Sequence, residues 1–488
     1  MPTALAALPI VVVVLTMALL HWRAALAGAV GLCVALAVIL GGNGLSGGAV
    51  MVAGVAAEAA SSTLTILWII LPALVIYEVQ SQSGTLERIR LALTRLSDDR
   101  AVQALLIAWF FGLFMEGAAG FGAPVALAAP LLVGLGFTPV RAVTLALLGH
   151  AAGVSFGAVG TPALAQIGLL GLPGSQLAAL TMMVHALPLC VLSLWVMRLA
   201  TDVPLTRRHV GIALLAALCF LLPALLLAGL AGPELPTLGG ALAGGAIFAV
   251  VMRSLHLKRI DEGKWRLSDL APYLLIVALV LLTRLLPPVQ VALSSLWLGW
   301  EWLGYSGGFA PFYHPGTMLA AGLVAGALLT GRGALLGPAL GAALRRLAPV
   351  ALALLVMLAL ARLMVHGGLI AQLAGAASQA GALWPLLSPF IGMLGTFVSG
   401  SATASNILFT DFQAATARAL DLPVVLMAAA QGVGAAIGNA IAPHNIIAGA
   451  ATVGLSGRDG EVLARTLIPV LTYTTFVGII VFIASRQF

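Results

Sequence analysis

Apolar runs of about 20 residues recur along this chain from one end to the other, and each is long enough to cross roughly 30 Å of hydrocarbon as a helix. The runs lack the strict alternation of a barrel strand, so their backbone must satisfy its hydrogen bonds within helices. Only 8% of the 488 residues are charged, whereas soluble domains carry about 25%. The sequence therefore predicts an all-α polytopic membrane protein, with one transmembrane domain over residues 1–488.

We expect about 12–14 transmembrane helices. The candidate spans are 4–20, 24–40, 63–79, 102–116, 141–160, 178–197, 210–230, 237–252, 271–286, 316–331, 348–365, 384–399, 422–440 and 467–484. A weaker helix is expected at 48–60, and the segment 297–315, rich in Trp and Tyr, is expected to be an outer interfacial loop. The Gly/Ala-rich stretches after the fourth and twelfth spans are candidates for re-entering the membrane instead of crossing it.

Basic residues are concentrated in alternate loops. The basic loops are 21–23, 88–100, 198–209, 253–266, 332–346 and 458–465, and the loops nearly free of Lys and Arg are 41–47, 231–236 and 287–315. Because Lys and Arg favour the cytoplasmic side, this alternation predicts that the basic loops are cytoplasmic and that the N-terminus lies outside. The first apolar run has no basic residue before it and "HWR" after it, the reverse of a cleaved signal peptide, so we expect a retained helix.

Composition and motifs argue against several other classes. The basic residues that give the net charge of +7 lie in short loops between spans, where they set orientation, so the charge does not support nucleic-acid binding. Cys33, Cys190 and Cys219 are scattered inside apolar runs without a CxxC or Cys/His cluster, so we expect no disulfide, metal or cofactor. The chain has no HExxH motif, and we do not expect an enzyme.

Two apolar helices run into stretches that are small, polar and rich in helix breakers. The first reads "FMEGAAGFGAPVALAAP" (Phe114–Pro130) and the second "FVSGSATASNILF" (Phe397–Phe409). Each is followed by an arm, "GHAAGVSFGAVGTP" (Gly149–Pro162) or "AAQGVGAAIGNAIAP" (Ala429–Pro443). Glycine permits unusual dihedrals and proline removes a backbone donor, so we expect broken helices or re-entrant hairpins at both places.

The two segments also predict an internal repeat. At one constant offset, Gly153, Gly157 and Pro162 match Gly434, Gly438 and Pro443. The first half is expected at about 63–197 (break 116–130, arm 149–162) and the second at about 348–484 (break 399–409, arm 429–445). The first break is approached from the cytoplasmic side and the second from outside, so the repeats are expected to have inverted topology, with substrate at the midplane.

Several motifs resemble those of the bacterial lactate permease family. They are "MEGAAGFGAPVALAAPLLVGLGF", "FGAVGTP", "YEVQSQSGTLERIRLALTRLSDDRAVQALLIAWFFGLF", "SGSATASNILF" and "VGLSGRDGEVLARTLIPVLTYTTFVGIIVF". The resemblance covers most of the chain from about residue 63 onward, apart from the variable middle. It implies proton-coupled import of lactate, glycolate or a related short 2-hydroxy acid. The chain departs from the family pattern at Ala402, where the pattern is acidic, and at His150 and His444, where it has asparagine and glutamine.

Three ionisable residues are candidates for proton coupling. Glu116 is expected about 24 Å along its helix from Arg100, and a lone intramembrane carboxyl commonly marks a proton relay; the alternative is a carboxyl that caps free amides in the break. Asp411 could carry a proton or pair with an arginine, or be a loop charge. Histidine is the natural switch near neutral pH, although His150 could equally be a helix-packing residue.

Substrate ligands are expected at both breaks and on two arginines. Arg284 and Arg362 could each hold a carboxylate through two parallel donors, or snorkel to the interface instead. The candidates at the breaks are Gly117, Gly120, Gly122, Ser401, Thr403, Ser405, Asn406 and His444. Free amides at broken helix ends are ready anion sites, while the polar side chains could bond a 2-hydroxyl or cap the helix ends. Glu58 is expected at an interface or in packing, and His366 at an interface.

The broken helices and the family resemblance together predict a secondary transporter of the bacterial inner membrane that imports a small monocarboxylate by proton symport. Its expected partners are the carboxylate, protons and the lipid bilayer. Two alternatives stay open, a sodium-coupled importer of larger organic anions and a passive channel.

Overall fold

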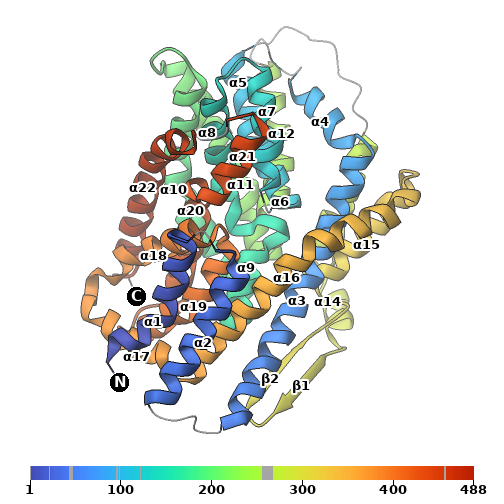
Figure 1. Ribbon diagram of the computed structural model, residues 1–488. Helices are drawn as coiled ribbons and strands as arrows, with labels where there is room; N and C mark the ends of the chain where they lie inside the picture. The colour runs from blue at the N-terminus through green and yellow to red at the C-terminus, as the bar shows by residue number, and fades with distance from the viewer. Residues whose placement is uncertain are drawn as a thin grey trace.

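The computed structural model describes residues 2–20, 22–42, 48–94, 97, 99–120, 122–254, 267–455 and 458–487. These residues form a bundle of long helices with one small β-hairpin at the end that holds the N-terminus (Figure 1). By length and composition, eleven of the described helices are able to cross a membrane, or twelve if a pair bent by 92° counts as one span. This confirms the predicted all-α polytopic class. The predicted loops at 41–47 and 253–266 lie largely outside the described residues.

The N-terminal helices form one side of the bundle. They are α1 (Thr3–Ala18), α2 (Ala24–Gly42), α3 (Gly48–Gln82) and α4 (Thr85–Thr94). The weak helix expected at 48–60 and the span at 63–79 were wrong as separate elements, because α3 is continuous over 35 residues. Neither Gly nor Pro lies between them, so nothing interrupts the helical hydrogen bonds there.

The first break is a tight turn within a hairpin of helices. The chain descends through α5 (Arg100–Ala104), the π-helical η1 (Leu105–Phe111) and α6 (Gly112–Ala118), and returns through α7 (Ala123–Gly134). Gly120 and Gly122 have φ of 58° and 80°, which side chains rarely adopt. Arg100 lies 4.0 Å from the ring centroid of Phe137, so the hairpin begins and ends at the same side. The expected break at 116–130 was too wide, because Pro124 starts a helix at its second position without losing a needed donor.

The first arm crosses the bundle in two pieces. Its elements are α8 (Pro139–His150), the 3₁₀ helix η2 (Ala151–Phe156) and α9 (Gly157–Leu170), followed by α10 (Gly174–Ala200). Ala158, Val159 and Gly160 have φ of 42°, 54° and 85°. The span expected at 141–160 is therefore not one helix, because these left-handed residues turn the chain.

The middle of the chain carries the β-hairpin. Its elements are α11 (Arg207–Ala231), α12 (Pro236–Ser254), η3 (Leu267–Asp269), α13 (Ala271–Leu285), α14 (Pro287–Ser294), β1 (Leu298–Trp302), β2 (Tyr305–Phe309), α15 (Pro315–Leu329), η4 (Gly333–Leu335) and α16 (Leu336–His366). The expected interfacial loop at 297–315 instead contains paired strands, because Leu303 and Gly304 both have positive φ and close a two-residue turn.

The second break is also the tip of a helix hairpin. The elements after α16 are α17 (Leu369–Ala377), η5 (Ser378–Leu383), α18 (Trp384–Ser399), α19 (Ala402–Ala419), α20 (Val424–Gly438), η6 (Asn439–Ile441), α21 (Pro443–Thr452) and α22 (Asp459–Ala484). Only Gly400 and Ser401 separate α18 from α19, so the break expected at 399–409 was too wide. Ser388 Oγ donates to Gln413 Oε1 at 2.9 Å, which brings the chain back to the side where α18 began.

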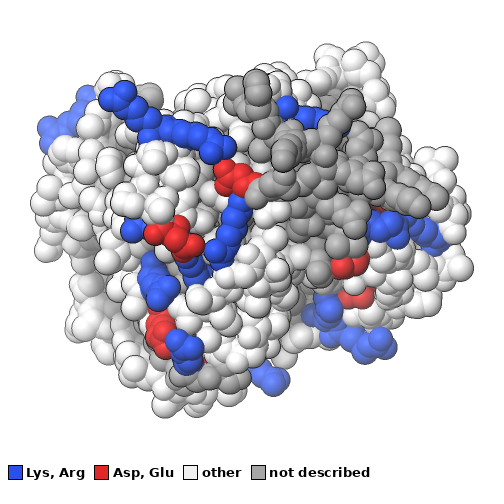
Figure 2. All heavy atoms as spheres, turned by 90° about the horizontal axis from the view of Figure 1, so that it is seen from above, with Lys and Arg blue, Asp and Glu red and all other residues white. Residues whose placement is uncertain are grey.

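The interruptions of the two halves are spaced alike. Ala119 and Gly400 are 281 positions apart, and so are Ala158 and Asn439, where each arm is interrupted. The first hairpin opens toward the end with α4 and α5, and the second toward the end with α17 and the N-terminus (Figure 1). Lys and Arg side chains cross the face at the α4–α5 end (Figure 2). These observations support the predicted inverted repeat, which stays a prediction.

Candidate functional site

Glu116 lies on the last turn of α6, beside the tip of the first hairpin, and only 5% of it is exposed. A side chain at Gly157 would overlap its Oε1 atom, so the start of α9 is shaped to admit this carboxyl. Among the described residues, no Lys or Arg forms an ion pair with Glu116. An ionised carboxylate in such a place is costly, whereas a protonated one is tolerated. The site therefore suits a group that gains and loses a proton.

His150, at the end of α8, is the nearest basic group to Glu116. Its Nε2 atom lies 3.9 Å from Glu116 Oε2. Its Nδ1 atom donates to the Ala146 carbonyl at 2.6 Å, because a carbonyl only accepts. The side chain of Asn439, the first residue of the interruption in the second arm, lies close enough to His150 to interact with it. One buried histidine thus joins the first hairpin tip to both arms.

The tip of the second hairpin meets the first arm. Val154 of η2 and Ala402 of α19 belong to one buried apolar cluster with two alanines of α20. Asn406 Nδ2 donates to the Pro162 carbonyl of α9 at 3.0 Å, while its Oδ1 atom is buried and has no partner among the residues that the structure describes. A Cβ at Gly400 would lie 3.0 Å from that of His444, which is exposed. We call the residues around these contacts the tip site: Glu116, Gly120, His150, Gly400, Asn406, Asn439 and His444.

The serines of the second break bond mainly to the protein. Ser401 caps α19 by accepting from the Ala404 amide at 3.3 Å. Ser405 Oγ donates to the Gly392 carbonyl at 2.9 Å and accepts from Gln431 Nε2 at 3.2 Å. Ser401 therefore follows the capping alternative, whereas Ser405 links α19 to α18 and α20. Thr403 is buried on the same first turn of α19.

The glycines of the first break have different surroundings. A Cβ at Gly117 would meet the backbone of Leu238, so this glycine allows α6 to pack against α12. A Cβ at Gly120 would lie 3.3 Å from Ala158 and 3.5 Å from Glu116 Oε1. Gly122 begins α7 with open space beside it. Only Gly120 and Gly122 therefore belong to the tip itself.

Arg284 is paired within the protein. Its Nη2 atom donates to Glu234 Oε1 at 2.7 Å, and its guanidinium carbon lies 3.8 Å from the ring centroid of Tyr313. Sequence reasoning missed Glu234, although an acid at the start of an apolar span ("GPELP") is a signal that could have found it. The carbonyl of Pro233 packs against Gly160, so this ion pair supports the turn of the first arm.

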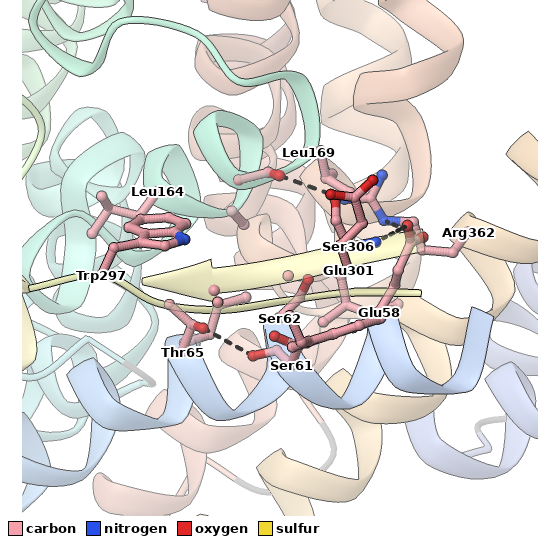
Figure 3. Close-up of a pocket in the computed structure, with 18 residues that line it drawn as sticks. Glu58, Ser61, Ser62, Thr65, Leu164, Leu169, Trp297, Glu301, Ser306 and Arg362 are labelled. Carbon is pink, nitrogen blue, oxygen red and sulfur yellow. Dashed lines mark hydrogen bonds and ion pairs between the residues drawn. The ribbon is translucent and has the colours of Figure 1, made fainter. Parts of the chain in front are cut away.

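Arg362 lies in a second place, at the β-hairpin. A cavity of about 740 Å³ opens between α3, α9, α16 and the two strands, and we call it the hairpin cavity (Figure 3). Arg362 Nε lies 3.9 Å from Glu58 Oε2, and His366 Nε2 lies 2.9 Å from the same oxygen. Asp411 of α19 is near enough to interact with the charge of Arg362. The structure thus places Glu58, Arg362, His366 and Asp411 together, away from the tip site.

A buried polar chain that sequence reasoning also missed holds the arms against the scaffold. Ser155 Oγ donates to the Gly432 carbonyl at 3.3 Å and lies 2.8 Å from His185 Nε2. His185 Nδ1 lies 2.5 Å from the hydroxyl of Tyr473. The only signal for it in the sequence is a lone histidine within an apolar span, which is weak.

The sequence is similar to a family of permeases and to several of its curated members. The family model described as L-lactate permease matches residues 3–299 and 308–488. The L-lactate permease of Salmonella typhimurium is 29% identical over 467 residues, covering 85% of this chain and 83% of that protein. The L-lactate permease of Bacillus subtilis is 29% identical, covering 87% and 85%. The glycolate permease GlcA of Escherichia coli is 27% identical, also covering 87% and 85%.

Two solved structures are similar in fold. The YdaH transporter of Alcanivorax borkumensis is 16% identical, with a TM-score of 0.51 over 89% of this chain and 87% of that one. MtrF of Neisseria gonorrhoeae, described as an antimetabolite efflux pump, is 15% identical, with a TM-score of 0.50 over 90% and 85%. At these identities the likeness concerns the fold alone.

Proposed function

Because this chain belongs to the L-lactate permease family, we propose that it is a symporter that imports a proton with lactate, glycolate or a related 2-hydroxy monocarboxylate. Its relatives are permeases, so the chain is a multi-pass membrane transporter. The inner membrane as its location and the outward N-terminus belong to the proposal; the basic face at the α4–α5 end supports them.

One observation carries the proposal: the buried carboxyl of Glu116, which has no Lys or Arg partner among the described residues, lies where the first hairpin tip meets both interrupted arms. A carboxylate substrate that entered alone would move negative charge against the membrane potential, which costs about 2.3 kcal/mol per charge per 100 mV. A proton carried on Glu116 makes the same step neutral. His150, 3.9 Å away, can hold the proton in passing or stabilise the ionised carboxylate.

We propose that the substrate binds between the two tips. Asn406 Oδ1, which has no partner in the described part of the chain, can accept a hydrogen bond from the 2-hydroxyl. The backbone at Gly400 and Gly120 has no side chain to keep an anion away, and His444 lies over Gly400. Arg284 stays outside this ligand set because Glu234 already holds it.

The test is uptake by purified protein in liposomes with an imposed inward proton gradient. Wild type is expected to concentrate lactate, to lose accumulation with a proton uncoupler and to ignore a sodium gradient. Glu116→Gln removes the proton site, so it should abolish accumulation. Glu461→Gln, which changes an exposed carboxyl paired with Arg458, is the matched control and should behave as wild type.

Each other outcome contradicts a part of this proposal. Accumulation by Glu116→Gln with unchanged dependence on the proton gradient removes Glu116 from the mechanism. Uptake that follows sodium and survives the uncoupler makes the protein a sodium symporter, and uptake that only equilibrates makes it a passive channel.

A further inference from the structure

The hairpin cavity is a built space apart from the tip site. Strands β1 and β2 cover it, and α3, α9 and α16 form its walls (Figure 3). The strands are held down by Tyr305, whose ring packs over Gly54, and by the Ser306 amide, which donates to Glu58 Oε1 at 3.4 Å. At about 740 Å³ the cavity lies in the range of small-molecule sites and leaves room for water beside a three-carbon acid.

Arg362 lines this cavity and carries a donor without an acceptor among the described residues. Its Nε atom is buried and has no hydrogen-bond partner there, and its Nη2 atom reaches the Gly168 carbonyl only at 3.5 Å. Unsatisfied buried donors are uncommon, because each costs about 1–3 kcal/mol. A ligand carboxylate could accept two parallel hydrogen bonds from Nε and Nη2, the two donors on one edge of this guanidinium.

Glu58 can lose its contact with Arg362 and still keep other partners. It lies 3.9 Å from Arg362 Nε, beyond hydrogen-bond length, while His366 Nε2 lies at 2.9 Å and the Ser306 amide at 3.4 Å. An entering carboxylate would therefore displace a weak contact, and Glu58 would keep two closer ones. Glu301, on β1, is exposed, where water screens its charge.

The remaining lining suits a short hydroxy acid. Ser61, Ser62 and Thr65 place hydroxyls on the α3 wall, and Trp297 and Trp300 supply flat apolar surface. The α9 wall continues toward Pro162, where Asn406 of the tip site is bound. Helix α9 therefore connects the cavity to the proposed transport site. The cavity lies at the end of the bundle with the β-hairpin, opposite the face at the α4–α5 end that carries the Lys and Arg side chains (Figures 1 and 2).

From these contacts we propose that the hairpin cavity is an outer recruiting site, in which Arg362 binds the carboxylate of a 2-hydroxy acid before it passes to the tips. The proposal rests on the proposed function for its substrate class. Arg362 acts by binding, and Glu58 competes with the ligand for the same guanidinium. Partner exchange at Arg362, in which the acid replaces Glu58 beside the guanidinium, then sets the affinity of the site for the acid.

The experiment is a titration of tryptophan fluorescence in the purified full-length protein with L-lactate, glycolate and the uncharged lactamide. Wild type should give a saturable change with both acids and none with lactamide. Replacing Trp297 and Trp300 by Phe should remove the change, which assigns it to the cavity. Glu116→Gln should keep it, because this site does not use the transported proton.

Two variants are expected to change the affinity for the acid in opposite directions. Arg362→Gln removes a charged donor and should weaken acid binding about tenfold or more. Glu58→Gln removes the competing charge and should tighten binding, which a folding defect would not do. Arg198→Gln, a change of the same kind at an exposed arginine of α10, should match wild type.

The outcomes separate this proposal from the proposed function. If wild-type liposomes concentrate lactate but Arg362→Gln binds and transports like wild type, the recruiting site is overturned and the symporter stands. If Glu58→Gln weakens binding as much as Arg362→Gln does, partner exchange is overturned. If acids bind in an Arg362-dependent way but wild type never accumulates them, the transport proposal fails and the site is supported.

Discussion

The buried pair of Glu234 and Arg284 shows how one neighbour changes what a residue can do. The sequence marks Arg284 as a group able to hold a carboxylate, and in the structure it holds one from the protein itself, at 2.7 Å. The exposed fractions of the two side chains are 3% and 11%, so water screens the pair little. The partners lie 50 positions apart, Glu234 in the loop between α11 and α12 and Arg284 in α13, and no spacing rule connects them.

We expect Glu234→Gln to lower the free energy of unfolding by about 3–5 kcal/mol, because it leaves the Arg284 charge buried and unopposed. Replacing the pair by Glu234→Leu and Arg284→Met removes both charges and should restore most of the loss. Thermal unfolding in detergent measures both effects. The double variant should also keep the wild-type KM for lactate; a stable double variant with a KM raised tenfold or more would instead identify Arg284 as a substrate ligand.

At the scale of elements, each hairpin tip depends on glycine with a left-handed backbone. Gly400 has φ of 69°, and an added Cβ would lie 3.0 Å from that of His444. Gly368, between α16 and α17, has φ of 76°, but a Cβ added there would have no atom of the described residues within 4 Å. Alanine at either position therefore costs about 1–2 kcal/mol of backbone strain, while only the substitution at Gly400 reaches the tip site.

Gly400→Ala and Gly368→Ala should therefore lower the melting temperature by similar amounts and differ in transport. We expect the first to reduce the initial rate of lactate uptake and the second to leave it near wild type, with uptake normalised to folded protein. Equal loss of uptake in both would mean that the strain, and not the tip, limits transport.

The elements also show what sequence could and could not predict. Both hairpin tips were found because Gly and Pro break helices through their own backbone chemistry. The break widths were wrong because a capped first turn, as at Ser401, lets small residues continue as helix. The left-handed turn at Ala158 and Val159 could not be predicted, because these residues disfavour it and only packing holds them there.

At the scale of the whole molecule, one buried acid ties the scaffold together at the basic end. Asp269 accepts from Arg88 Nη2 at 2.6 Å and from Arg332 Nη2 at 2.7 Å, and its carbonyl accepts from Gln80 at 3.1 Å. These contacts join α3 and α4 to the start of α13 and to the end of α15. The side chain of Asp269 is 1% exposed. Asp202 has the same chemistry in an exposed setting, since it pairs with Arg100 and Arg141 but is 66% exposed.

Asp269→Asn should destabilise the protein far more than Asp202→Asn, although each removes one carboxylate between two arginines. We expect a loss of about 3–5 kcal/mol for the buried acid and only a small change for the exposed one. The hydrogen bond from Arg141 holds the pKa of Asp202 below its usual value. Its contribution is therefore present at pH 7 and is lost as the pH falls through that lowered pKa.

Melting temperatures of both variants and wild type, measured between pH 7 and pH 3, check this expectation. The gap between wild type and Asp202→Asn should be small and should close at the acid end, whereas Asp269→Asn should be clearly less stable at pH 7. Its lactate KM should stay at the wild-type value, because the hydrogen bonds described for Asp269 join scaffold segments outside the two hairpins. Equal losses for the two variants would show that burial of Asp269 adds nothing, and that helix packing alone holds the scaffold.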